Sequence, residues 1–123
     1  MARTMAVWLA TGAALLAGGT AAAQTVPTGK ASFAPCASCH GTKAGERKLG
    51  PTLFGVVGRK AASVPAARYS AAMKSSGIVW TPAALDAFLT APRKHVPGTI
   101  MTFVGVSDKK KREALIRYLG TLR

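Results

Sequence analysis

Glycine and proline are concentrated in the middle of this chain, between His40 and Tyr69. The seven positions are Gly41, Gly45, Gly50, Pro51, Gly55, Gly58 and Pro65. Neither a regular helix nor a strand tolerates that density. Irregular segments longer than about 12–15 residues are uncommon in a compact domain. The middle of the chain therefore needs something other than its own secondary structure to fold around.

The motif Cys36-Ala-Ser-Cys39-His40 directly precedes this segment. Two thiols at this spacing can add across the two vinyl groups of a haem, and the adjacent imidazole is placed to bind the iron. The irregular segment would then wrap a flat apolar ring instead of a protein core. We expect one covalently attached haem c, with four apolar side chains of the segment packed against it. They are Leu53, Phe54, Val56 and Val57.

Three other uses of the two cysteines compete with haem attachment. A thioredoxin-like dithiol has the same spacing but belongs on a βαβ scaffold, for which the sequence offers no pattern. A zinc site would need a fourth ligand, and His95 is the only further imidazole. A disulfide between Cys36 and Cys39 would close too small a loop to stabilise much, and it leaves His40 unexplained.

The first 23 residues have the pattern of a secretory signal peptide. Arg3 supplies a positive start, residues 5–16 are an almost unbroken apolar run, and residues 21–23 are small. A membrane anchor is the alternative, but the run is shorter than the ~20 residues a spanning helix needs. We expect cleavage after Ala23 and a single domain at residues 24–123, close to the lower size limit for a self-sufficient core.

Helix signals lie toward both ends of residues 24–123, which predicts an all-α fold with long loops. Near the C-terminus, Ser107 is expected to cap a helix that stops at Gly120. Its apolar face repeats at i, i+3, i+4 and i+7. Those residues are Leu115, Tyr118, Leu119 and Leu122.

Three shorter helical stretches are expected before that helix. Thr81 and Pro82 form a cap and first helical position, followed by a stripe that ends before Pro92. A short helix should lead into the cysteines with Phe33 on its buried side, and residues 70–74 should form another brief turn or two. The stripe consists of Leu85, Phe88 and Leu89.

The ligands of the iron decide between electron transfer and small-molecule chemistry. His40 Nε2 is the expected proximal ligand, with Nδ1 donating to a backbone carbonyl, for which Pro51 is a reasonable acceptor. Met101 follows a bent loop, residues 97–100, whereas core methionines usually lie on a helix face. Thioether ligation would raise the reduction potential and close the iron to substrates. The other candidates for the sixth ligand are Met73, His95 and Lys94.

Several motifs, in order along the chain, resemble class I cytochrome c of the short mitochondrial and related bacterial type. The similarity runs from about Gly29 to Leu119 and predicts that family's small fold, with N- and C-terminal helices packed together and loops around one haem. The motifs are the cysteine signature, residues 49–55 (LGPTLFG), 58–60 (GRK), 77–81 (GIVWT) and 97–101 (PGTIM).

The resemblance also implies roles for individual residues. His40 and Met101 would be the axial ligands, Pro51 the carbonyl partner of His40, and Thr99 a neighbour of the buried propionate. Gly29 and Phe33 would pack the first helix on the last, against Leu115 and Tyr118. The residues that would help to hold the propionates are Arg59, Tyr69 and Trp80.

The chain departs from the family pattern at two positions. Phe88 stands where many relatives have a tyrosine whose hydroxyl reaches the methionine sulfur, so that hydrogen bond should be absent. His95 lies beside the ligand loop where relatives often have an aromatic residue, and we expect it to be partly exposed. At high pH, Lys94 could replace Met101, as the family's behaviour implies.

The formal net charge is +13, and removal of Arg3 with the signal peptide would leave +12. Such a surplus predicts acidic protein partners, or contact with an anionic membrane, rather than nucleic acid, because the basic residues are scattered. We expect a cationic patch around the haem edge that includes Lys30, Lys48, Arg93 and Lys94.

The leading hypothesis is a monomeric periplasmic one-electron carrier and not an enzyme. It would shuttle electrons from a respiratory or photosynthetic donor complex, or a dehydrogenase, to a terminal acceptor such as an oxidase or reductase. A haem peroxidase or gas-binding protein with an open sixth position is one alternative. A dedicated electron-transfer subunit of one dehydrogenase is the other.

Overall fold

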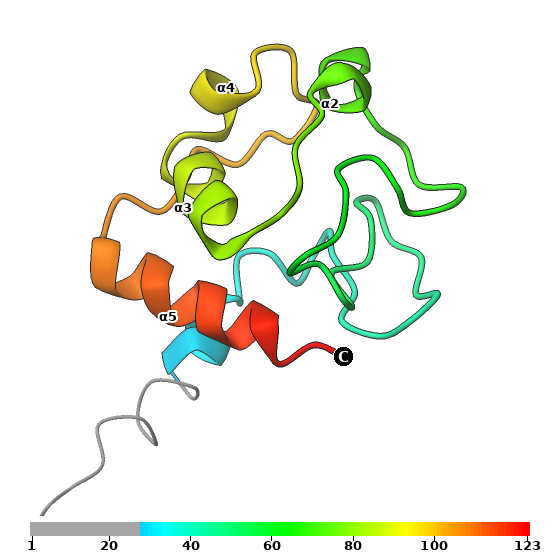
Figure 1. Ribbon diagram of the computed structural model, residues 1–123. Coiled ribbons are helices and arrows are strands. Elements are labelled where there is room, and N and C mark those ends of the chain that lie inside the picture. The colour runs from blue at the N-terminus through cyan, green and yellow to red at the C-terminus, as the bar shows by residue number, and fades with distance from the viewer. Residues whose placement is uncertain (1–27) are drawn as a thin grey trace, which may run out of the picture.

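The structure, a computed structural model, describes residues 28–123 (Figure 1). The predicted signal peptide and its cleavage point after Ala23 lie outside the described residues. Helices joined by long loops make up the described part, with one isolated antiparallel bridge between Lys60 and Val79, so the all-α prediction is confirmed. The helices are residues 28–32, α2 (Ala71–Ser75), α3 (Pro82–Thr90), α4 (Pro92–His95) and α5 (Lys109–Gly120).

The helical segment at residues 28–32 crosses α5 (Figure 1). Gly29 allows this crossing, because a Cβ atom there would contact the carbonyl oxygen of Ala114 and lie 2.8 Å from Tyr118 Cβ. Phe33 is buried, and its ring centroid lies 5.5 Å from that of Tyr118. The expected packing of the first helix on the last is therefore present.

α5 begins one residue later than predicted. Asp108, not Ser107, is the N-cap: its backbone is extended and its carboxylate accepts a hydrogen bond from Lys111 N at 3.0 Å. Ser107 instead uses its carbonyl to accept from Arg112 Nη1. A carboxylate at this place also suits the positive end of the helix dipole, which favours Asp108 over a neutral hydroxyl.

α3 has the predicted start and the predicted buried stripe. Thr81 Oγ1 accepts from Ala84 N at 3.1 Å, and Leu85, Phe88 and Leu89 are buried.

α4 was not predicted, since Pro92 was interpreted only as the end of a helix. Proline also favours the first position of a new helix, because its missing N–H would have no partner there, and α4 begins at Pro92.

α2 matches the brief turn expected around residues 70–74, with Ser70 Oγ accepting from Met73 N at 3.0 Å.

The irregular segment between His40 and Tyr69 makes backbone hydrogen bonds to the residues that precede it and to those that follow it. Gly50 N donates to Cys39 O at 2.7 Å. Trp80 N donates to Arg59 O at 2.8 Å, which places residue 59 beside residue 80. In the described part of the chain, no helix is long and apolar enough to cross a membrane.

Candidate haem site

A mainly apolar cavity of about 720 Å³ lies between the loops and α3. Its volume falls within the roughly 300–1,000 Å³ usual for ligand and cofactor pockets. All nine residues that sequence analysis assigned to the cofactor line this one cavity, although they are spread over 66 positions of the chain. They are Cys36, Cys39, His40, Pro51, Arg59, Tyr69, Trp80, Thr99 and Met101.

The two cysteines lie on a turn at the wall of the cavity, and no disulfide joins them. His40 N and Cys39 N both donate to Cys36 O, at 2.9 and 3.1 Å, so the turn holds the motif compactly. Burial raises the pKa of the Cys36 thiol, and the neighbouring Cys39 adds to this rise. Within residues 28–123, no group of three or more His, Cys, Asp or Glu side chains could share a metal ion.

The His40 imidazole is held at its edge by the loop that follows. Its Nδ1 lies 2.7 Å from the carbonyl oxygen of Pro51, and because a carbonyl only accepts, Nδ1 carries the proton. Gly50 is required beside the ring, since a Cβ there would lie 2.6 Å from His40 Cε1. Burial lowers the pKa of His40, against the hydrogen bond to Pro51, and Arg59 lowers it further. The imidazole is therefore neutral at neutral pH, with Nε2 free to bind a metal.

Met101 lies beyond a tight turn at Pro97 and Gly98. Gly98 has φ +91°, and Thr99 N donates to Val96 O at 3.0 Å, as expected for a turn with glycine at its third position. Thr99 Oγ1 then accepts from Met101 N at 3.3 Å, which orients the next residues. The half-buried Met101 packs against the hydrophobic core.

The Arg59 side chain is only partly hydrogen-bonded within the protein. Nη1 donates to Phe54 O at 2.8 Å and Nη2 to Thr52 O at 2.9 Å. Within the described residues, its Nε is the one buried side-chain polar atom with no hydrogen-bond partner. Burial lowers the pKa of this guanidinium. An anion in the cavity would satisfy Nε and offset the burial of the charge, which is what a haem propionate supplies.

Other expectations about the cavity need correction. Leu53 and Val56 line it, but Val57 packs against the protein core, and Phe54 is absent from the cavity wall. Three aliphatic side chains at the wall were missed because they are 53–80% exposed, and no sequence pattern marks an exposed aliphatic residue as part of a site. They are Leu49, Ile100 and Val104.

The expected cationic patch is also only partly available. Lys48 Nζ donates to Ala37 O at 2.9 Å and lies 4.0 Å from Glu46 Oε1. Arg93 Nη2 lies 3.4 Å from Thr102 O. Lys30 and Lys94 are exposed. Lys48 is thus occupied within the molecule, which the sequence alone could not reveal.

Residues 26–123 match the family model for cytochrome c. The chain belongs to the cytochrome c family. It is 47% identical to cytochrome c2 of Rhodopila globiformis over 88 residues, covering 72% of this chain and 83% of the relative. It is 45% identical to cytochrome c of Euglena viridis over 85 residues, covering 69% of this chain and 83% of the relative.

The solved structure of cytochrome cH from Methylobacterium extorquens is also similar to this cytochrome. The two are 44% identical, with a TM-score of 0.74 over 78% of this chain and 97% of the other. The predicted class I family and its small fold are confirmed. The chain carries haem c as a covalently attached cofactor, and it is a haem c electron carrier.

Proposed function

We propose that this cytochrome is a periplasmic one-electron carrier whose single haem c is attached to Cys36 and Cys39, with His40 and Met101 as axial ligands. The observation that carries the proposal is the convergence of these four residues on one apolar cavity. When bound, the haem supplies an iron centre that gains or loses one electron. Every other part of the proposal concerns what the chain's own residues do around it.

His40 and Met101 would serve as complementary ligands. The Pro51 carbonyl accepts a hydrogen bond from His40 Nδ1. This hydrogen bond fixes the imidazole ring and raises the basicity of Nε2. Phe88 is buried at the wall of the same cavity and offers no hydroxyl to a methionine sulfur. A thioether ligand favours the reduced state, so the proposed carrier has a raised reduction potential.

The polar groups of the cavity would hold the two propionates. Arg59 offers its unpaired Nε, and Tyr69, Trp80 and Thr99 complete the set proposed for this role. The hydroxyl of Tyr69 already accepts from Val64 N at 3.2 Å, which leaves its own proton free to donate. The remaining wall is mostly apolar and would keep water away from a bound haem.

Transfer to partners would take place at the rim of the cavity. Leu49, Ile100 and Val104 expose apolar surface there, and the chain's surplus positive charge would steer it to acidic redox proteins.

We also propose that residues 1–23 direct export and are removed after Ala23, leaving residues 24–123 as a monomer in the periplasm. The partners are a donor complex or dehydrogenase and a terminal acceptor.

The intact mass of protein made together with haem-attachment machinery tests attachment and export. The expected mass is that of residues 24–123 plus one haem. A mass without haem would contradict attachment, and retention of residues 1–23 would contradict cleavage.

Absorption spectroscopy tests the sixth ligand. A weak long-wavelength band in the oxidised protein reports iron bound to a thioether, and we expect it to vanish in Met101→Ala. Its persistence in that variant would assign the ligand elsewhere, with Met73 as the other methionine at the cavity wall.

Stopped-flow electron transfer to an acidic partner should slow as salt rises, because screening weakens steering. A rate independent of salt would contradict the steering.

A further inference from the structure

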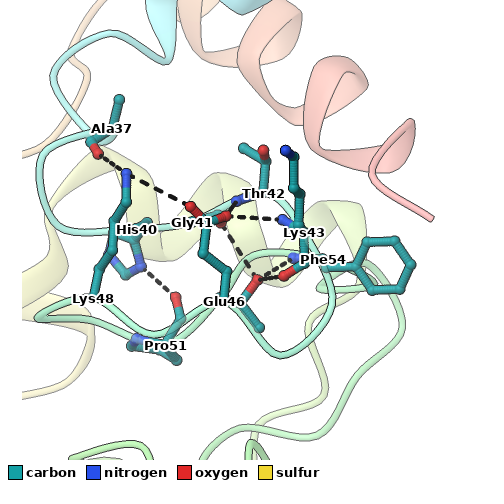
Figure 2. A network of polar contacts seen from close by, with 10 residues as sticks. Ala37, His40, Gly41, Thr42, Lys43, Glu46, Lys48, Pro51 and Phe54 are labelled. Atoms are coloured by element: carbon teal, nitrogen blue, oxygen red, sulfur yellow. Dashed lines mark hydrogen bonds and ion pairs between the residues drawn. The ribbon is translucent and has the colours of Figure 1, made fainter.

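Glu46 and Lys48 form a polar pair that does not line the haem cavity. They lie on a second, shallower hollow between residues 30–37 and the loop at 41–48. Figure 2 shows the pair spanning two parts of the chain. Lys48 Nζ donates to Ala37 O at 2.9 Å and lies 4.0 Å from Glu46 Oε1. Ala37 is the residue after Cys36, inside the attachment motif.

The carboxylate of Glu46 is held in place by the backbone of the loop that follows His40. Its Oε2 accepts from Thr42 N at 2.9 Å and from Lys43 N at 3.2 Å. Gly41 leaves room for this carboxylate, because a Cβ there would overlap Glu46 Oε2. The loop that leaves His40 is therefore folded back onto the same carboxylate that faces Lys48 (Figure 2).

Lys48 is close in sequence to both residues that orient the imidazole. Gly50, two positions later, packs against His40 Cε1, and its N donates to Cys39 O at 2.7 Å. The carbonyl of Pro51, three positions later, accepts a hydrogen bond from His40 Nδ1. The Lys48 contact thus fixes the start of a short segment whose end sets the orientation of His40.

The side chains of Lys48 and Glu46 are 38% and 33% exposed. Ion pairs with that exposure contribute little to stability, because water screens the charges. Stabilisation alone therefore does not account for the arrangement, whereas its geometry connects both sides of the proximal ligand.

We propose that Lys48 and Glu46 are positioning residues for His40, holding the attachment motif and residues 48–51 at a fixed spacing. That spacing sets the His40–Pro51 hydrogen bond, and through it the donor strength of the imidazole toward the iron. The inference rests on the proposed ligation by His40.

The test compares haem-loaded Lys48→Met with the wild type. Two readouts report the ring: the hyperfine-shifted proton resonances of the oxidised protein, and the solvent-exchange rate of the His40 Nδ1 proton. In Lys48→Met we expect the haem methyl resonances to shift and the Nδ1 proton to exchange several-fold faster. Lys48→Arg, which keeps a long cationic donor, should restore both toward the wild type.

Lys43→Met is the matched control. It removes one positive charge from the same loop, and within the described residues the Lys43 ammonium group makes no hydrogen bond. Both readouts should stay at the wild-type values in this variant. Glu46→Gln, which keeps an oxygen acceptor but loses the charge, should shift both in the same direction as Lys48→Met, by less.

Wild-type resonances and exchange in both Lys48→Met and Glu46→Gln would overturn the proposal. Equal changes in Lys43→Met and Lys48→Met would also overturn it, since charge rather than contact would then be responsible. If Lys48→Met yields too little haem-loaded protein, the comparison of Glu46→Gln with Lys43→Met decides. Failure of His40 ligation itself is distinguishable, because the wild type would then lack the spectrum of a histidine-ligated haem.

Discussion

Replacing Gly29 with alanine tests the crossing of the N-terminal helical segment with α5. The new Cβ would overlap Ala114 O and lie 2.8 Å from Tyr118 Cβ. Neither atom is the end of a flexible side chain, so the two helices must separate. Overpacking of this kind costs about 1–3 kcal/mol. Loosening the Phe33–Tyr118 ring contact forfeits up to about 0.5–1.5 kcal/mol.

One effect acts in the opposite direction. Alanine is a better helix former than glycine by about 1 kcal/mol. The clash and the loosened ring contact together exceed this gain, so we expect Gly29→Ala to lower the free energy of unfolding by about 0.5–3.5 kcal/mol. Guanidinium unfolding of the haem-loaded protein, followed by far-UV circular dichroism, should show a lower midpoint with an unchanged slope.

Gly120→Ala is the matched control. Gly120 is the last residue of α5 and lacks a positive φ, and a methyl group there would meet nothing within 4 Å beyond its own helix and chain neighbours. The same chemical change should therefore leave stability unchanged or raise it by up to about 1 kcal/mol. If Gly29→Ala unfolded at the wild-type midpoint, or both variants moved together, the reasoning from close contact would be refuted.

Three further changes have expected outcomes. Arg59→Met removes two hydrogen bonds to backbone carbonyls and should cost about 1–3 kcal/mol in denaturant unfolding, with a lower reduction potential in redox titration because a positive charge is lost. Asp86→Asn removes the 2.6 Å ion pair of the buried Arg112. Because Asp86 is half exposed, we expect the free energy of unfolding to fall by only about 1–2 kcal/mol. An unchanged free energy of unfolding would refute a stabilising role for this pair. Hydrogen bonding to Lys111 N lowers the pKa of Asp108 below 3.8, so its stabilising effect is complete above that pH and is lost as the pH falls through the lower folded-state pKa. The stability difference between wild type and Asp108→Ala should accordingly be present at pH 7 and shrink below pH 3.8, and a difference independent of pH would contradict the assignment.

Most of the helices, and the cavity that the expected site residues share, could be predicted because their signals are local or strongly patterned. Thr81 and Pro82 start α3 as expected, and the motif from Cys36 to His40 carries its chemistry in five residues. Ser107 was a wrong prediction, because two adjacent residues could both cap α5 and the backbone at Asp108 decided between them. Pro92 was interpreted as a stop, although the same residue starts α4.

Contacts between residues distant in the sequence could not be predicted from local pattern. Lys48 is one of many cations in the sequence, and only the folded loop places its ammonium group on Ala37 O. The unpaired Arg59 Nε likewise depends on how residues 52–59 turn back on themselves. Exposure of Leu49 and Val104 at the cavity rim is a property of the assembled surface, not of their neighbours in the chain.

The loop that contains Met101 is held firmly at both ends. Thr99 N bonds to Val96 O before it, and Val106 N bonds to Leu89 O at 2.7 Å after it. Gly105 lies so close to α3 that a Cβ would be 2.5 Å from Thr90 O. If Met101 is the ligand, as we propose, these contacts would limit how far its sulfur could move when the iron changes charge. The nuclear rearrangement that accompanies each transfer would then be small, and a low reorganisation energy would let an electron arrive and leave quickly under a modest driving force.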